Sequence, residues 1–297
     1  MRYVFYCLVP FLVLLMALSL SAVIAYGVVI VLGDASEFRQ IITRVTQVFL
    51  LLSIFPFMAY LRINKAELGF APRGQFFKQL LQGFGLGLLV LLPVFGVLFV
   101  LDVNVIDETQ HWTVGLLAKY MAITLGVALL ISVIEESLFR GIVLVGLKKK
   151  LPVLIAILLT SIYYAGLHFL SAKTNPVMQD VTLWTGFQLL GEAFNNVVDP
   201  QHFSAFMALL MVGVFLGVLR TQVDVSLGLC IGCHTSWVWQ IKMSKKLFNT
   251  DFNVQYHYLV SHYDGVIGPF VSVWLTLILI GYFAYQYINK TKLNINP

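Results

Sequence analysis

The residues in this sequence best suited to chemistry are two adjacent glutamates, Glu135 and Glu136, followed by Arg140 in an otherwise apolar stretch. A charge at the centre of a bilayer costs from roughly 2.5 to more than 10 kcal/mol, so ionisable residues in such a stretch are functional candidates. Glu136 and Arg140 are four residues apart and share a helix face, whereas Glu135 points about 100° away. We expect Glu136 and Arg140 to pair, either for function or only to fix packing, and Glu135 to remain available.

Two histidines, His168 and His234, lie in later apolar runs. With a rise of about 1.5 Å per residue, Glu135, His168 and His234 lie roughly 18, 26 and 14 Å from the turns on one side of the membrane, so tilted helices can bring them into one layer. A carboxylate can take a proton from water, and a histidine can stabilise an oxyanion or protonate a leaving amine. Together these three residues suit hydrolysis of an amide bond.

Two cofactors fit parts of this set. Glu135, His168 and His234 could hold zinc or another divalent metal with one coordination position open, although Glu135 could equally act on water alone, and we favour the metal-free site. Cys230, Cys233 and His234 also spell C-x-x-C-H, the attachment signature of c-type haem. We disfavour haem, because this pattern lies inside an apolar helix with no soluble domain around it.

The composition predicts an all-α membrane protein with an intramembrane polar site. Of the 297 residues, 59% are hydrophobic and 11% are charged, whereas an ordinary soluble domain has about 25% charged residues. Only helices and closed barrels satisfy the backbone in lipid, and the apolar runs lack the alternation of barrel strands. The formal net charge is +5, but the basic residues sit in short loops, so we expect the lipid bilayer and no nucleic acid as a partner.

The apolar runs predict about eight transmembrane helices. The first run is longer than the roughly 7 to 15 apolar residues of a cleavable signal peptide, so we expect it to be retained. The stretch 181–198 is too polar to cross and is predicted to form an amphipathic helix at the interface, and residues 112–120 to form another. The predicted crossings are residues 3–32, 42–61, 80–101, 121–147, 151–170, 203–219, 225–241 and 266–288.

Most basic residues fall on one side of these predicted crossings. They are Arg2, Arg62, Lys65, Arg73, Lys78, Lys148, Lys149, Lys150, Arg220, Lys290 and Lys292. The positive-inside rule makes that side cytoplasmic, with both termini inside. Three lysines, Lys242, Lys245 and Lys246, fall on the opposite side. We expect an integral protein of the bacterial inner membrane, and the oligomeric state is left open.

The ionisable residues resemble two motifs of the CPBP family of intramembrane proteases, which includes CAAX prenyl endopeptidases and bacteriocin-processing or immunity (Abi-like) proteins. Glu135, Glu136 and Arg140 match the first motif, Glu-Glu-x-x-x-Arg. Tyr164 and His168 match the second motif, Phe-x-x-x-His, with one aromatic residue exchanged for another. This resemblance spans about residues 120 to 241.

The third motif of the family, His-x-x-x-Asn or a relative, begins here at His234, but Val238 stands at the place of the amide. By this resemblance Thr235, Ser236 or Trp237 would have to supply the missing polar donor. The change at position 238 also leaves room for a member that has kept the site and lost the activity.

The resemblance implies three parts of the chain, with N-terminal transmembrane helices in residues 1–119, a catalytic core in 120–241, and an outer loop and last helix in 242–297. It implies that Glu135 activates water, that Arg140 holds Glu136 as its partner, and that histidines complete the site. The implied function is an intramembrane endopeptidase, a hydrolase that cleaves a membrane-associated or lipidated protein or peptide. The alternatives are a catalytically silent binding or immunity partner, and a proton-coupled transporter, whose expected inverted repeats are missing from the sequence.

Overall fold

The computed structural model describes residues 2–223 and 226–295, and these residues form helices apart from one two-stranded ribbon. Val225, where the seventh predicted crossing begins, lies outside them, as do the side chains of Arg2, Lys290 and Lys292. The α-helices are α1 (Arg2–Leu32), α2 (Phe38–Leu61), α3 (Lys65–Leu68), α4 (Arg73–Val100), α5 (Val114–Glu136), α6 (Leu144–Lys148), α7 (Val153–Phe169), α8 (Thr185–Val197), α9 (Phe203–Val218), α10 (Leu227–Leu247) and α11 (Pro269–Ile295).

Shorter elements connect these helices. Two π-helices, η1 (Ser137–Val143) and η4 (Leu219–Val223), continue α5 and α9. The 3-10 turns are η2 (Met178–Asp180), η3 (Pro200–His202) and η5 (His257–Leu259). Strand β1 (Asn104–Ile106) pairs antiparallel with β2 (Phe248–Thr250), so that the chain after α4 is tied to the chain after α10.

Each of the eight predicted crossings contains a helix. Six helices are long and apolar enough to cross a membrane by length and composition, namely α1, α2, α4, α5 with its continuation to Lys148, α9 and α11. Helix α7 is equally apolar but has only 17 residues. The protein is therefore an integral membrane protein, although α10 does not meet this hydropathy criterion because three lysines follow its polar centre.

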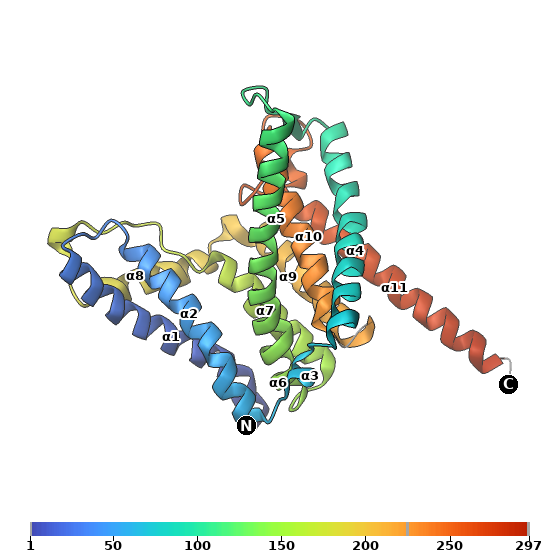
Figure 1. The fold of residues 1–297 in the computed structure, drawn as a ribbon, viewed down its shortest axis with the longest axis horizontal. Helices are drawn as coiled ribbons and strands as arrows, with labels where there is room; N and C mark the ends of the chain where they lie inside the picture. Colours follow the sequence, from blue (N-terminus) through green and yellow to red (C-terminus); the bar gives the residue numbers. More distant parts are fainter. Residues whose placement is uncertain (1, 224–225, 296–297) are drawn as a thin grey trace.

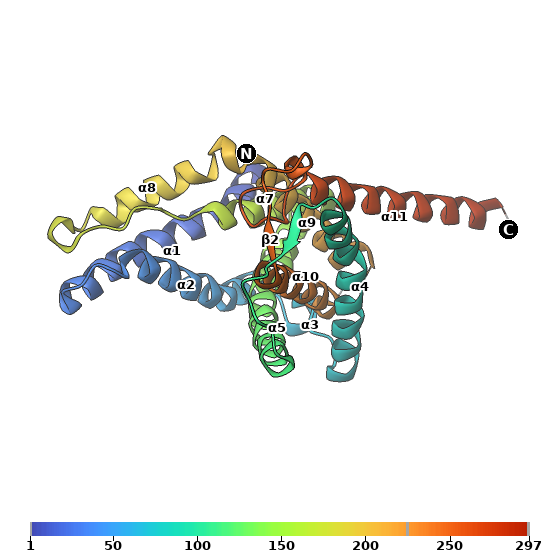
Figure 2. The same cartoon turned by 90° about the horizontal axis from the view of Figure 1, so that it is seen from above.

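The two predicted interfacial helices have different outcomes. The stretch 181–198 does contain a helix, α8, which lies along α1 and buries residues such as Leu190 (Figure 2). The separate helix predicted for 112–120 is wrong. Helix α5 begins at Val114, where the Thr113 hydroxyl accepts a hydrogen bond from the Leu116 amide at 3.2 Å, and it runs unbroken into the membrane segment.

Figure 1 shows a core of α4, α5, α7, α9 and α10 with a wing on each side. One wing consists of α1, α2 and α8, and the other is α11, which projects away from the core alone. The α5 and α10 helices continue across the predicted part boundaries at 119/120 and 241/242. The three-part division of the chain stays a prediction.

Close helix packing fixes α10 in the core. A Cβ atom at Gly83 of α4 would lie 2.1 Å from the Leu229 carbonyl oxygen, and one at Gly232 of α10 would lie 2.0 Å from the Leu80 carbonyl oxygen. The two backbones therefore touch, which only small residues allow in a membrane helix pair. Since both helices are locked in register, the position of His234 on α10 is fixed as well.

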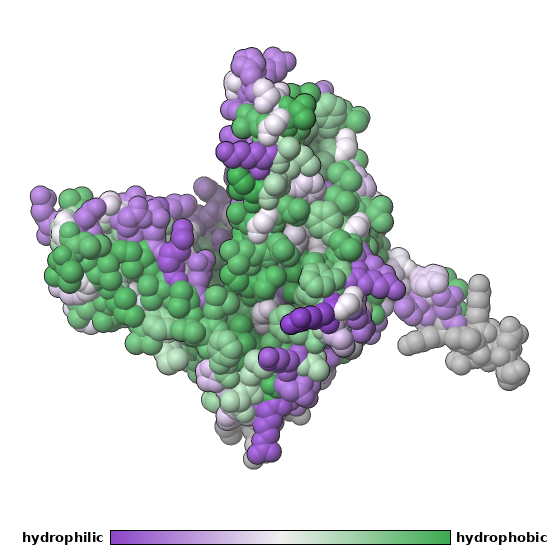
Figure 3. All heavy atoms as spheres, viewed as in Figure 1, coloured by the Kyte–Doolittle hydropathy of each residue, from purple (hydrophilic) through white to green (hydrophobic). Residues whose placement is uncertain are grey.

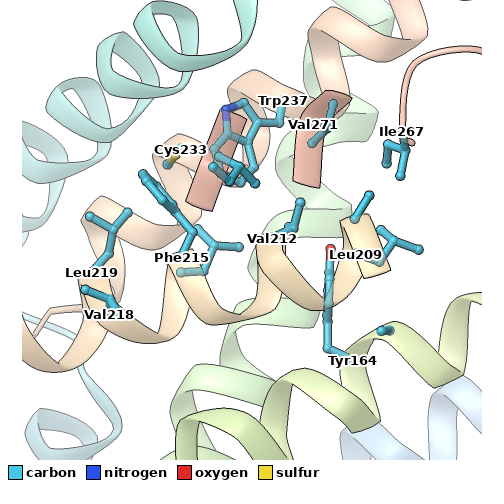
Figure 4. Packing of buried hydrophobic residues seen from close by; sticks show 14 of the residues in the cluster. Tyr164, Leu209, Val212, Phe215, Val218, Leu219, Cys233, Trp237, Ile267 and Val271 are labelled. Carbon is cyan, nitrogen blue, oxygen red and sulfur yellow. The ribbon is translucent and has the colours of Figure 1, made fainter. Parts of the chain in front are cut away.

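Apolar side chains from α7, α9, α10 and α11 meet beside this helix pair. Phe215 packs against the Trp237 ring with 5.3 Å between their centroids, and Val212 and Val271 lie alongside (Figure 4). Tyr164 points into the same cluster from α7. This packing excludes solvent from the core of the protein, so any polar group in it needs a partner.

Basic loops gather at the end of the molecule that carries α3 and α6. Arg220 donates to the carbonyl oxygens of Glu67 and Leu68 at 3.1 and 3.2 Å, and Lys149 donates to the Leu61 carbonyl oxygen at 3.0 Å. These contacts join the ends of α2, α6 and α9, the lower end in Figure 1. Loops that sequence analysis assigned to one side of the membrane are thus neighbours in space.

Candidate active site

The predicted pair of Glu136 and Arg140 is confirmed. Arg140 Nη1 lies 2.9 Å from Glu136 Oε1, and neither side chain has any solvent exposure. The chain changes from α-helix to π-helix directly after Glu136, so Arg140 lies within η1. Single π-turns inside α-helices occur often at functional sites. The sequence carries no signal that predicted this one.

Arg140 has further partners from two other helices. Its Nη2 atom approaches the Gly213 carbonyl oxygen of α9 at 3.4 Å, and its Cζ atom lies 4.5 Å from the Tyr164 ring centroid. Gly213 meets Ser161 of α7 so closely that a Cβ atom would lie 2.7 Å from the serine Cβ. The buried guanidinium is therefore held by a carboxylate, a carbonyl and an aromatic face, which offsets its desolvation.

Glu136 also holds His234. The His234 Nδ1 atom lies 2.8 Å from Glu136 Oε1, the same oxygen that accepts from Arg140. Because the carboxylate oxygen is the acceptor, Nδ1 carries the hydrogen, and a neutral imidazole then has its lone pair at Nε2. This bond joins α5 to α10, and it orients Nε2 of His234 towards Glu135.

Glu135 faces His234 from the other side, as the rotation of about 100° around the helix predicts. Its Oε2 atom lies 3.8 Å from His234 Nε2, and its side chain keeps 28% exposure. This distance is too long for a direct hydrogen bond and suits two groups that share one water molecule.

Tyr164 separates the two predicted histidines. Its ring centroid lies 4.7 Å from that of His168 and 6.1 Å from that of His234. Its hydroxyl lies 3.5 Å from His234 Nε2, while His168 Nδ1 donates to the Tyr164 backbone carbonyl at 2.8 Å. Glu135, Glu136, Arg140 and His234 thus form one cluster, and His168 stands behind the tyrosine ring.

A loop before α11 lies near this site, because the charge of Glu135 acts on the pKa of its Tyr263. Tyr263 packs on Phe169 with 5.1 Å between ring centroids, and the Asp264 side chain accepts from the Val266 and Ile267 amides at 3.0 and 2.6 Å. These two bonds close a turn at Asp264. No pattern in the sequence linked this loop to the glutamates, because the link is purely tertiary.

Charges at the site affect this loop. Partial burial and the negative charges of Asp264 and Glu135 raise the pKa of Tyr263 to about 12. The phenol therefore keeps its proton at neutral pH and remains a hydrogen-bond donor next to Glu135. Burial also raises the pKa of Asp264, while its two amide partners and the charges of Lys245 and His168 oppose that shift.

The polar residues expected to replace the missing amide of the third motif make hydrogen bonds within the helix core. Thr235 Oγ1 donates to the Ile231 carbonyl oxygen of its own helix at 2.7 Å.

The other two candidates, Ser236 and Trp237, lie where α4 packs against α10. Trp237 Nε1 donates to the Gly87 carbonyl oxygen at 3.1 Å, and Ser236 Oγ accepts from Gln240 Nε2 at the same distance. The polar hydroxyl that does face His234 comes from Tyr164 of the second motif. The expectation of a donor at 235, 236 or 237 stays a prediction, although Thr235 and Trp237 already donate to backbone carbonyl groups.

The structure shows how the residues that could bind a metal ion or haem are arranged. Within residues 2–223 and 226–295, no three or more His, Cys, Asp or Glu side chains are grouped closely enough to hold a metal ion. Glu135 and His234 approach each other, but His168 bonds to the Tyr164 backbone. Cys230 and Cys233 are fully buried in α10, so the haem signature lacks the space that a covalently attached haem needs.

The part of the chain that contains the whole cluster matches the model of a known family. Residues 117–240, which include both glutamates, Arg140, Tyr164 and both histidines, match the model of a family described as type II CAAX prenyl endopeptidase Rce1-like. No curated protein and no solved structure matches the chain. This stretch is therefore similar to the Rce1-like type II CAAX prenyl endopeptidase family, in agreement with the resemblance to CPBP proteases.

Proposed function

We propose that this protein is an intramembrane endopeptidase that hydrolyses a peptide bond with water activated by Glu135. The main support is the 3.8 Å separation between Glu135 Oε2 and His234 Nε2, which lets the carboxylate and the imidazole bond to one water molecule placed beside them. The match of residues 117–240 to the family model supports the same chemistry. The Glu135 side chain is 28% exposed, but its Oε2 atom is buried and has no hydrogen-bond partner among the described residues, while the neighbouring Glu136 is completely enclosed.

Each residue in the cluster has a role in this proposal. The water gives one hydrogen bond to Glu135 and one to His234 Nε2, and Glu135 takes its proton as the oxygen attacks the carbonyl carbon. Glu136 and Arg140 keep the imidazole in the correct orientation and tautomer. The Tyr164 hydroxyl donates to the oxyanion.

The second half of the reaction returns the proton. The bond between the carbonyl carbon and the nitrogen breaks, and Glu135 transfers the proton that it took from water to the leaving amine. One peptide bond and one water molecule thus become one carboxylic acid and one amine, with no other reactant. His168 acts indirectly, because its bond to the Tyr164 backbone holds the donor tyrosine in place.

The substrate in this proposal is a membrane-associated or lipidated protein or peptide, cut near the end of the molecule that carries the basic loops. The clustering of Arg220, Lys149 and α3 at that end supports a cytoplasmic location for it. This orientation places both termini in the cytoplasm. The proposed compartment is the inner membrane of a bacterium.

The proposal is tested with the purified full chain in detergent micelles and a farnesylated peptide that ends in a CAAX sequence, together with a myristoylated peptide. We expect Glu135→Gln to lower the cleavage rate by at least about 1,000-fold, since it removes the base and leaves the volume unchanged. The matched control is Glu108→Gln, an exposed glutamate outside the helices. Cleavage of either peptide at the wild-type rate by both Glu135→Gln and His234→Ala would refute the proposed mechanism.

Val238 favours a second candidate, a silent binding partner that captures a membrane peptide without cutting it. A silent protein would bind either peptide with the same affinity in the wild type and in Glu135→Gln, and neither would release a product. Product formation by the wild type alone excludes this candidate.

A further inference from the structure

A large cavity lies beside the candidate active site, between α1, α2 and α7 and the segment formed by η1 and α6. Its volume is about 590 Å³. Figure 3 shows a hydrophobic surface over α1 and α2 on this side of the molecule, with hydrophilic atoms at the lower end. Its wall is mostly apolar and includes Val13, Leu138, Phe139 and Tyr163.

The wall of this cavity suits a hydrocarbon chain better than a peptide. A peptide in lipid needs a partner for every backbone amide and carbonyl group, and each unsatisfied group costs several kcal/mol. Apolar side chains form most of this wall, and the hydroxyl of Tyr163 is already used by the Cys7 carbonyl oxygen. An extended peptide would therefore lose more hydrogen bonds here than the cavity can replace.

Three cations, Arg62, Lys149 and Lys150, lie at the basic end of the cavity, and no aspartate or glutamate is among the described residues that line it. Lys150 Nζ lies 5.5 Å from the Tyr6 ring centroid. Arg62 follows the last residue of α2 in a left-handed conformation, with φ of 52°. Both cations are therefore positioned where the apolar wall ends.

One of the three cations is partly compensated. Lys149 Nζ lies 3.9 Å from Glu67 Oε1 and also donates to the Leu61 carbonyl oxygen. Counting this glutamate against three cations leaves two positive charges at the mouth. An amphiphile with a cationic head would be repelled there, and one with an anionic head would be attracted.

We propose that this cavity binds an anionic phospholipid of the bilayer, with an acyl chain between α1, α2 and α7 and the phosphate at Arg62 and Lys150. This lipid site is distinct from the glutamate cluster, because none of Glu135, Glu136 and His234 lines the cavity. It shares a wall with that cluster, since Leu138 and Phe139 follow Glu136 directly in η1. The bound lipid packs against η1 and thereby limits the movement of Arg140.

The full chain in neutral detergent can be titrated with phosphatidylglycerol and with phosphatidylcholine of the same acyl chains, with bound lipid counted by native mass spectrometry. We expect phosphatidylglycerol to bind at least 10-fold more tightly. Each basic residue near a membrane surface contributes about a factor of five, so Arg62→Gln/Lys150→Gln should weaken phosphatidylglycerol binding about 25-fold. The matched control is Arg73→Gln/Lys78→Gln, which removes two exposed charges that do not line the cavity.

A second variant tests the apolar part of the site. Val13→Trp fills the cavity from α1 without changing its charge, and it should weaken both lipids equally, with helix content checked by circular dichroism. The catalytic variant Glu135→Gln should bind phosphatidylglycerol as the wild type does, so this inference can succeed where the proposed function fails.

Four outcomes would overturn the proposal of a phospholipid site. The first is equal affinity for the two lipids, and the second is full phosphatidylglycerol binding by both the Arg62→Gln/Lys150→Gln and Val13→Trp variants. The third is displacement of the lipid by a farnesylated peptide at equal concentration, which would make the cavity part of the substrate site. Displacement by inorganic phosphate alone would also count against it, because it would show that the acyl chain contributes nothing.

Discussion

A double-mutant cycle on Glu136 and Arg140 tests whether the buried cluster is electrostatically coupled. At 2.9 Å, two unit charges attract by about 6 kcal/mol with an effective dielectric constant near 20. Removing one partner of a buried pair costs about 3–5 kcal/mol, because the other charge stays buried without compensation. We expect Arg140→Met and Glu136→Leu each to lower the free energy of unfolding by that amount, about 100- to 5,000-fold in the unfolding equilibrium.

The double variant, Glu136→Leu/Arg140→Met, removes both charges together. What remains is the unpaired Nδ1 of His234, worth about 1–3 kcal/mol, so the double variant should be less destabilised than either single variant or at most equal to it. The coupling energy is then at least about 3 kcal/mol. Unfolding is measured by sodium dodecyl sulfate titration in mixed micelles with a neutral detergent, followed by far-ultraviolet circular dichroism.

The control cycle uses the exposed pair Lys149 and Glu67, whose charged atoms lie 3.9 Å apart and whose side chains are 34% and 45% exposed. Exposed pairs contribute about 0–1 kcal/mol, so Lys149→Met and Glu67→Gln should be nearly additive. A coupling energy below about 1 kcal/mol for Glu136 and Arg140 as well would refute the reasoning, because it would mean that the buried charges do not depend on each other.

Three further outcomes follow from the packing and the outer loop. Gly232→Leu should destabilise the protein by about 3 kcal/mol or more, because the new side chain meets backbone, whereas Gly281→Leu in open space should change stability little in the same titration. The pKa of Tyr263 is raised to about 12, so this tyrosine should lose its proton only at strongly alkaline pH. The difference in tyrosinate absorbance between the wild type and Tyr263→Phe should stay near zero below that pH. Burial raises the pKa of Asp264, so folding favours its protonated form, and stability is lost as the pH rises through the folded-state pKa. Asp264→Asn should therefore raise the melting temperature at pH 7 but not below the ordinary aspartate pKa of about 4.

Much of the fold was predictable because hydropathy alone marks helices in lipid. All eight apolar runs contain helices, and the polar run 181–198 contains α8. The predictions failed where hydropathy changes little along a continuous helix. The stretch 112–120 looked separable from the crossing that follows, yet α5 passes through it, because a helix capped at Thr113 has no break before Glu136.

The site was predictable only as far as local spacing reaches. Glu136 and Arg140 pair because four residues place them on one helix face, and this held even though the chain there is a π-helix. The bond from His234 to Glu136 and the position of the Tyr263 loop depend on how helices pack, which spacing within one helix does not encode. The roles of these residues in catalysis stay a proposal.

Helix α10 has a consequence for how the protein is made. It carries His234 near its centre and three lysines towards its C-terminal end, and both features lower its hydropathy. On its own it lacks the hydropathy of a membrane-spanning helix, yet its inner half is buried against α4 and α5. Both partners are synthesised earlier, so the polar helix that carries part of the candidate site enters the membrane against a protein surface already in place.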